Sequence, residues 1–168
     1  FQNEYLPDAN ERLAWATGFT GSAGAAFVFR SSIGGKGAVV FVDGRYTLQA
    51  KAQLDDKLFE IADLNELGPH GWLAKQKLGG ARIGYDPKLV SPDAIDRLGE
   101  AARRAGAELV AADVNPLDAA WRDRPPEPVR PVVPHAIAHA GETSASKRQR
   151  IGELLSEQTL EAAVITSP

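Results

Sequence analysis

The 168-residue sequence contains neither cysteine nor methionine. Without cysteine the chain can form no disulfide and has no thiolate to act as a nucleophile or as a metal ligand. This absence fits a reducing compartment, so we expect a cytoplasmic location. Lysine and arginine together number 19, against 22 aspartate and glutamate residues, which gives a formal net charge of −3. We therefore expect no binding to nucleic acid or to an anionic membrane surface through bulk charge.

Long apolar runs are also missing, because no uninterrupted hydrophobic segment approaches the length of a membrane span. The opening Phe-Gln-Asn-Glu-Tyr begins in the middle of a pattern and carries no initiator methionine or signal peptide, so we expect the chain to be part of a longer protein. Hydrophobic residues make up 43% and charged residues 24% of the sequence, which is typical of a globular protein able to bury a core.

A glycine-rich stretch, TGFTGSAGAAFVF at residues 17–29, has three glycines at three-residue spacing before an apolar segment. A phosphate-binding loop needs a strand before its glycines and a helix after them, since the helix N-terminus then faces the anion. The order here is reversed, because residues 10–16 predict a short helix capped by Asn10 and residues 25–29 predict a strand. The pattern therefore predicts a glycine-rich turn and not a nucleotide site.

The remaining periodicity predicts an α/β fold with a mixed β-sheet flanked by helices. Residues 25–30 and 38–42 favour a β-hairpin, and a helix is expected to begin near Arg45. Alternating elements follow, with strands expected at 58–61, 82–85 and 108–111 and helices expected at 71–78 and 91–104.

The segment RPPEPVRPVVP, residues 124–134, is rich in proline and predicts an extended interdomain linker. Beyond it, residues 143–156 predict an amphipathic helix and residues 162–166 predict a strand. One helix and one strand bury too little surface to form a core. We therefore expect three segments, which are a first domain at 1–122, a linker at 123–142 and the incomplete start of a second domain at 143–168.

Two blocks, EYLPDANERLAWATGFTGSAG (4–24) and FVDGRYTLQA (41–50), resemble the Xaa-Pro aminopeptidase family in its longer, three-domain form. Residues 115–125, NPLDAAWRDRP, are similar to the family's pattern before its proline-rich linker. The resemblance implies a creatinase/prolidase N-terminal domain of ribonuclease H-like fold, followed by the start of a second similar domain. It also implies that the opening helix and strand of the first domain are absent. We expect residues 143–166 to be an equivalent unit that fills the resulting gap in the sheet.

Enzymes of this family remove the N-terminal residue that precedes proline, with two divalent metal ions, usually manganese, in a C-terminal catalytic domain. The resemblance thus implies that the parent protein is a homodimeric metallopeptidase acting on short peptides with proline in second position. On this interpretation the chain itself holds no catalytic residue and no metal, and it shapes substrate access and supports dimerisation. The alternative is a stand-alone protein- or peptide-binding module of the same fold without peptidase activity.

Arg45, in the DGRY block, is the one candidate substrate-binding residue. It follows an apolar strand at a position where Asp43 can cap the next helix and Gly44 can turn the chain. Two interpretations remain open. Arg45 forms an ion pair with Asp43 or another carboxylate, or it projects toward the metal site of a neighbouring subunit, since the N-terminal domains of similar enzymes contribute to a partner's substrate pocket.

Other chemically interesting residues favour structural roles. His135 and His139 have the i, i+4 spacing of two metal ligands on a helix, but no third ligand is evident, so they predict a solvated connector. The adjacent carboxylates Asp55 and Asp56 predict a solvated helix end. Packing in the core or between domains is expected for the three tryptophans, Trp15, Trp72 and Trp121.

Overall fold

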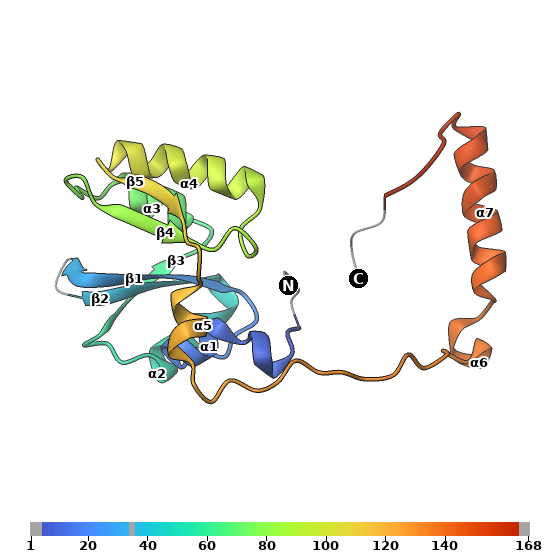
Figure 1. Ribbon diagram of the computed structural model, residues 1–168, viewed down its shortest axis with the longest axis horizontal. Coiled ribbons are helices and arrows are strands. Elements are labelled where there is room, and N and C mark those ends of the chain that lie inside the picture. Colours follow the sequence, from blue (N-terminus) through green and yellow to red (C-terminus); the bar gives the residue numbers. More distant parts are fainter. Residues whose placement is uncertain (1–4, 34–35, 165–168) are drawn as a thin grey trace. The chain divides into compact units, whose positions relative to one another are not determined.

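The computed structural model describes residues 5–33 and 36–164, which fall into two compact units, Phe1–Pro128 and Val129–Pro168 (Figure 1). The first unit contains, in chain order, η1 (Asp8–Asn10), α1 (Arg12–Thr17), β1 (Gly24–Ile33), β2 (Lys36–Val42), η2 (Gly44–Tyr46), α2 (Thr47–Gln53), β3 (Phe59–Asp63), α3 (Gly68–Ala74), β4 (Arg82–Tyr85), α4 (Pro92–Arg104), β5 (Glu108–Ala111) and α5 (Pro116–Ala120). The second unit contains α6 (Ile137–Ala140) and α7 (Ser144–Glu157).

The predicted hairpin is present, because β1 pairs antiparallel with β2 from Gly24 opposite Val42 to Val28 opposite Ala38. On its other side β2 pairs parallel with β3, so this three-stranded sheet is mixed. The strands β4 and β5 pair parallel with each other. The α/β class and the mixed sheet are therefore confirmed, but the described strands form two sheets, where the sequence predicted one.

The core is organised on both faces of β2, whose residues Val39 to Val42 are almost completely buried. Side chains alternate between the two faces of a strand, so Val39 and Phe41 face one cluster and Val40 and Val42 face the other. The first cluster includes α3 and α4, and the second includes Phe19 and residues of α2. Helices thus cover both faces of this strand (Figure 1).

Trp72 of α3 lies at the centre of an aromatic group in the first cluster. Its ring stacks on Phe27 and Phe29 at centroid distances of 5.9 and 5.8 Å, and it meets the edge of Phe41 at 6.0 Å. The indole N–H of Trp72 donates a 3.1 Å hydrogen bond to Glu60, which satisfies the one polar atom of the side chain. The expectation that this tryptophan packs in the core is confirmed.

Several boundaries differ from the expected ones for local reasons. Asn10 does not cap α1, since it lies within η1 and Glu11 occupies the cap position. The helix α3 begins at Gly68 instead of residue 71, because Pro69 in its first turn suits a helix start. The helices α5 and α6 were not expected, since five and four residues are too few to show a helical period.

The second unit is mainly the helix α7. Thr143 caps α7 by accepting a hydrogen bond from the backbone N–H of Ser146. The helix expected at residues 143–156 is therefore present. The strand expected at 162–166 is wrong for residues 162–164, which are exposed and form no strand, while 165–166 lie outside the described residues. The described part of this segment therefore fills no gap in a sheet.

Among the described residues no helix has the length and apolar character to cross a membrane.

The glycine-rich turn joins α1 to β1, as expected, and its glycines are required by backbone conformation at Gly18 and by packing at Gly24. Gly18 ends α1 with a φ of 82°, a left-handed conformation that favours glycine. A Cβ on Gly24 would lie 2.9 Å from Leu13 Cδ2 and 3.1 Å from the carbonyl oxygen of Phe41. Because that oxygen belongs to the central strand, it cannot move aside easily.

Replacement of Gly24 by alanine is expected to lower the free energy of unfolding by about 1–3 kcal/mol, the usual cost of overpacking a close-packed site. Denaturant unfolding of the variant and the parent chain measures the change. Gly84→Ala is the matched control, because a Cβ at this strand position meets no atom within 4 Å. Equal losses of stability in both variants would contradict the packing explanation.

Candidate functional site

The first candidate site is the Arg45 corner, which we define as Thr20, Ser22, Arg45, Tyr46 and Gln53. Two loops meet here, one from the glycine-rich turn and one from η2. The hydroxyl groups of Ser22 and Tyr46 lie 2.7 Å apart, and the side-chain amide of Gln53 donates to the Thr20 hydroxyl at 2.8 Å. The Ser22–Tyr46 contact connects the two stretches of sequence that resemble the same family.

Arg45 emerges at the end of the central strand β2, and Asp43 determines its local geometry. The Asp43 carboxylate accepts the backbone N–H of Arg45 at 2.9 Å and so caps η2. It also accepts the guanidinium Nε at 3.1 and 3.2 Å and Nη2 at 2.7 Å. The guanidinium carbon lies 5.1 Å from the centroid of the Tyr46 ring. An ion pair with Asp43 is therefore observed, as one of the two open interpretations predicted.

The exposure of this pair is uneven. The Arg45 side chain is 63% exposed, whereas that of Asp43 is 14% exposed. Hydrogen bonds from the Arg45 side chain hold the pKa of Asp43 below its ordinary value, with a smaller contribution from the backbone N–H of Arg45. The corner thus presents a charged, planar donor group at the surface, a geometry that suits carboxylates and peptide carbonyls.

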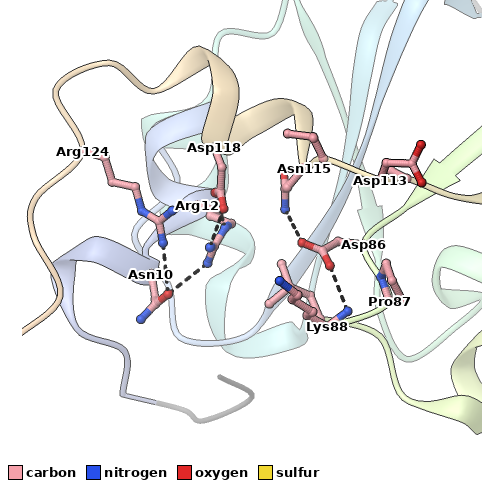
Figure 2. Close-up of a pocket in the computed structure, with 12 residues that line it drawn as sticks. Asn10, Arg12, Asp86, Pro87, Lys88, Asp113, Asn115, Asp118 and Arg124 are labelled. Atoms are coloured by element: carbon pink, nitrogen blue, oxygen red, sulfur yellow. Dashed lines mark hydrogen bonds and ion pairs between the residues drawn. The ribbon is translucent and has the colours of Figure 1, made fainter.

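The second candidate site is a pocket with a volume of about 420 Å³ at the carboxyl ends of β4 and β5 (Figure 2). Because these strands are parallel, the loops that follow them meet at one edge of their sheet. The other wall comes from η1, α1 and α5. The lining residues are Asn10, Arg12, Asp86, Pro87, Lys88, Leu89, Ala112, Asp113, Val114, Asn115, Asp118 and Arg124.

Charged groups in this pocket pair with one another. Figure 2 shows Arg12 between Asn10 and Asp118, and its guanidinium contacts the two Asp118 oxygens at 2.7 and 3.0 Å. Asp86 accepts hydrogen bonds from the Asn115 amide at 2.9 Å and from the backbone N–H of Lys88 at 2.8 Å. These pairings make the pocket wall a structural network, which sequence reasoning missed because it joins Arg12 to Asp118 over 106 positions and Asp86 to Asn115 over 29.

The hydrogen bonds of this network also shift the pKa values of its charged side chains. The hydrogen bond from Arg12 is the main cause that lowers the pKa of Asp118, and the charge of Arg124 adds to it. The same hydrogen bond raises the pKa of Arg12 above its ordinary value. For Asp86, the backbone N–H of Lys88 is the main cause of a lowered pKa. All three side chains are therefore charged at neutral pH.

No group of three or more His, Asp or Glu side chains within residues 5–33 and 36–164 has the geometry to hold a metal ion. The rings of His135, which precedes α6, and of His139, which lies within it, are 5.8 Å apart, and both residues are exposed. Asp55 uses one carboxylate oxygen to accept the backbone N–H of Lys57, which is a turn interaction.

Trp15 and Trp121 form a stacked pair with a centroid distance of 5.3 Å between α1 and the end of α5. Trp121 is 8% exposed and Trp15 is 40% exposed. The expected packing is confirmed for Trp121, which is buried, whereas Trp15 stacks on it but stays exposed and lies outside the core clusters.

The mixed sheet with helices on both faces defines an α/β domain whose surface carries a charged corner and a polar pocket. The profile of the Creatinase/Prolidase N-terminal domain family matches residues 5–118, which is more than half of the sequence. The chain belongs to this family.

Similar proteins support the same assignment. The chain is 34% identical to a probable Xaa-Pro aminopeptidase P of Neurospora crassa over 168 residues, and 34% identical to Xaa-Pro aminopeptidase 2 of Homo sapiens over 167 residues. Each alignment covers 98% of this chain and 24% of the relative. The crystal structure of X-prolyl aminopeptidase from Caenorhabditis elegans, described as a cytosolic enzyme with a di-nuclear active site, superposes with a TM-score of 0.74. That match has 29% identity and covers 94% of this chain and 25% of the other.

The resemblance inferred from the sequence is thereby confirmed at the level of the family. The chain spans about the N-terminal quarter of the aminopeptidases P that it matches. The catalytic domain of those relatives lies outside the matched quarter.

Calorimetric titration of the 168-residue chain with Mn²⁺ is expected to show no binding tighter than about 10 μM, or about −7 kcal/mol. The reason is that hard divalent metals need several clustered oxygen ligands, and the described residues contain no such group. The active parent enzyme serves as the positive control, and stoichiometric binding by the chain alone would contradict this expectation.

The Asp43 carboxylate is expected to titrate below the ordinary range of an aspartate in a ¹³C-detected NMR titration, and Arg45→Ala is expected to raise its pKa. A folded-state pKa that is lowered means that the pair's contribution to stability is present at neutral pH and is lost as the pH falls through that pKa. Arg130→Ala, in an exposed part of the linker, is the control. An unchanged Asp43 titration in Arg45→Ala would show that the observed bonds do not persist in solution.

Proposed function

We propose that this chain is the non-catalytic N-terminal portion of a cytoplasmic, metal-dependent Xaa-Pro aminopeptidase. The observation that carries the proposal is its match over 98% of its length to about a quarter of such enzymes. The parent protein would remove the N-terminal residue of short peptides that have proline in second position. This chain would shape access to the active site and support a homodimer.

The metal chemistry belongs to another part of the parent protein. A relative of known structure is described as having a di-nuclear active site. The described residues of this chain do not fit such a site, because they include no cluster of three metal-ligating side chains. We therefore assign the two divalent ions, expected to be manganese, to a catalytic domain beyond this chain and derive no catalytic step from them.

The proposed domain organisation is a first domain at 1–122, a linker at 123–142 and the start of a second, similar domain at 143–168. The end of the family match at residue 118 supports the first boundary. In α7 the apolar side chains of Ile151 and Leu154 are 39% and 50% exposed, three positions apart on one helix face. A helix with such a face needs further residues to cover it, as the beginning of a larger domain would have.

Arg45 is the residue that we propose to bind substrate, across a subunit boundary in the dimer of the parent enzyme. Two observations support this role. The Arg45 side chain is 63% exposed, and its guanidinium is held by hydrogen bonds to Asp43. A planar donor group held in this way can bind the carboxylate or a carbonyl of a short peptide with little loss of side-chain entropy.

In the full-length parent enzyme, Arg45→Ala is expected to lower kcat/KM for an Xaa-Pro peptide at least about tenfold, a loss of about 1.4 kcal/mol of transition-state stabilisation. The melting temperature should change little, because exposed ion pairs contribute little to stability. Arg45→Lys keeps the charge but loses the planar donor pair, so it should recover only part of the activity.

Asp43→Asn provides the matched control, since it weakens the local ion pair and keeps the guanidinium. A purely structural Arg45 predicts that both Arg45→Ala and Asp43→Asn lower the melting temperature and leave the activity per folded molecule unchanged. That result would contradict substrate binding by Arg45. Activity assays and thermal unfolding on the same preparations give both quantities.

A further inference from the structure

The proline-rich segment begins with an arginine that is bound on several sides. The Arg124 Nε donates to the backbone carbonyl of Ala9 at 2.6 Å, and its Nη1 lies 3.0 Å from Asp118. Nη2 lies 3.4 Å from the side-chain oxygen of Asn10 and 3.6 Å from Glu127. Arg124 thus joins η1, α5 and its own segment at one point.

Asn10 and Arg12 complete this group from the other end of the chain. The Asn10 side-chain oxygen accepts from Arg12 at 3.1 Å, while its amide donates to Glu127 at 3.3 Å. Arg12 in turn binds both oxygens of Asp118. We call the five residues Asn10, Arg12, Asp118, Arg124 and Glu127 the clasp; Figure 2 labels the first four of them.

Arg12, Asp118 and Arg124 are mostly shielded from water, which makes their charged hydrogen bonds stronger than those of an exposed ion pair, whereas the Glu127 side chain is 54% exposed. The side chains of Arg12 and Arg124 are 15% and 24% exposed, against 63% for Arg45. The guanidinium of Arg124 also lies 5.9 Å from the centroid of the Trp121 ring, which is itself buried. The buried Trp121 side chain thus holds the chain on the first unit just before the clasp begins.

The spacing of the anchored residues fits the conformation that proline favours. Arg124 and Glu127 follow the turn at residues 122–123 and are three positions apart. A polyproline II helix has three residues per turn, so side chains at this spacing lie on one side of the segment. Pro125 and Pro126, between the two charged anchors, restrict the backbone to that conformation.

We propose that the clasp is a lock that holds residues 122–127 on the first domain, so that the freely moving linker begins near Pro128 and not at residue 123. Opening of the clasp would release about six residues. At about 3.1 Å per residue in an extended proline-rich chain, this adds roughly 19 Å of reach to whatever follows. The clasp would therefore limit the positions that the next part of the chain can take. This inference goes beyond the proposed function and does not require peptidase activity.

The lock should depend on the charge of Asp118. This carboxylate faces Arg12 from α1 and Arg124 from the linker, and Asp86 and Glu127 also act on Arg12. Since the pKa of Asp118 is lowered, the clasp contributes at neutral pH and is lost as the pH falls through that pKa.

Backbone ¹⁵N relaxation of the 168-residue chain tests the proposal. In the wild-type chain the amides of Arg124 and Glu127 are expected to have order parameters near about 0.85, as in a rigid backbone, and those of Val129 and Arg130 values below about 0.6. Arg124→Ala and the isosteric Asp118→Asn should bring Glu127 below about 0.6. Arg130→Ala, which removes the same type of side chain outside the clasp, should leave Glu127 unchanged.

The wild-type profile can overturn the proposal by itself, if Glu127 is as mobile as Val129. It is also overturned if Glu127 stays rigid in Asp118→Asn or in Arg124→Ala while the amide shifts of β2 remain those of the wild type. A drop at Glu127 with unchanged β2 shifts in both variants supports the lock, because the β2 shifts show that the core is still folded.

Discussion

The burial of β2 on both faces is the constraint on which the first unit depends. Four consecutive apolar side chains, from Val39 to Val42, can be removed from water only if helices cover each side of the sheet. The chain meets this requirement with α3 and α4 on one face and with Phe19 and α2 on the other. The glycine-rich turn is a consequence, since α1 must return to the sheet beside β2 without space for a Cβ at Gly24. The exposed position of Arg45 is a second consequence, because the chain reaches the surface directly after the buried strand β2 ends.

Features that depend on neighbouring residues could be predicted from the sequence. Apolar segments around a glycine-rich turn predicted the hairpin, and the helices expected from residues 91 and 143 begin one position later, with Ser91 and Thr143 as their caps. The Asp43 cap of η2 belongs to the same class, since donor and acceptor are two positions apart. The division of the described strands into two sheets was not predictable in this way, because strand pairing depends on chain segments that are distant in sequence. At residues 162–164 a strand was expected where the structure has none, since a short apolar run forms a strand only when another strand is available to pair with it.

The clasp marks the limit of sequence reasoning more clearly. Arg12 and Asp118 are separated by 106 positions, and no local pattern connects an arginine in a short helix with an aspartate in another. The proline-rich composition of 124–134 correctly indicated an extended segment, but composition carries no information about which of its residues bind the domain. The family resemblance at residues 115–125 was the one signal that included Asp118 and Arg124, and it did not assign them a role.

The clasp arginines, Arg12 and Arg124, differ from Arg45 in how far they are exposed to water. Arg12 and Arg124 connect segments far apart in the chain and are mostly shielded, so their hydrogen bonds restrict the fold and leave little donor surface for a ligand. Arg45 bonds to a residue only two positions away, so the pair orders almost no additional chain. Because most of its side chain remains in water, an incoming carboxylate or carbonyl can approach the guanidinium without breaking the core beneath it. An exposed contact of this kind contributes little to stability, so the substrate role that we propose for Arg45 would place no demand on the fold.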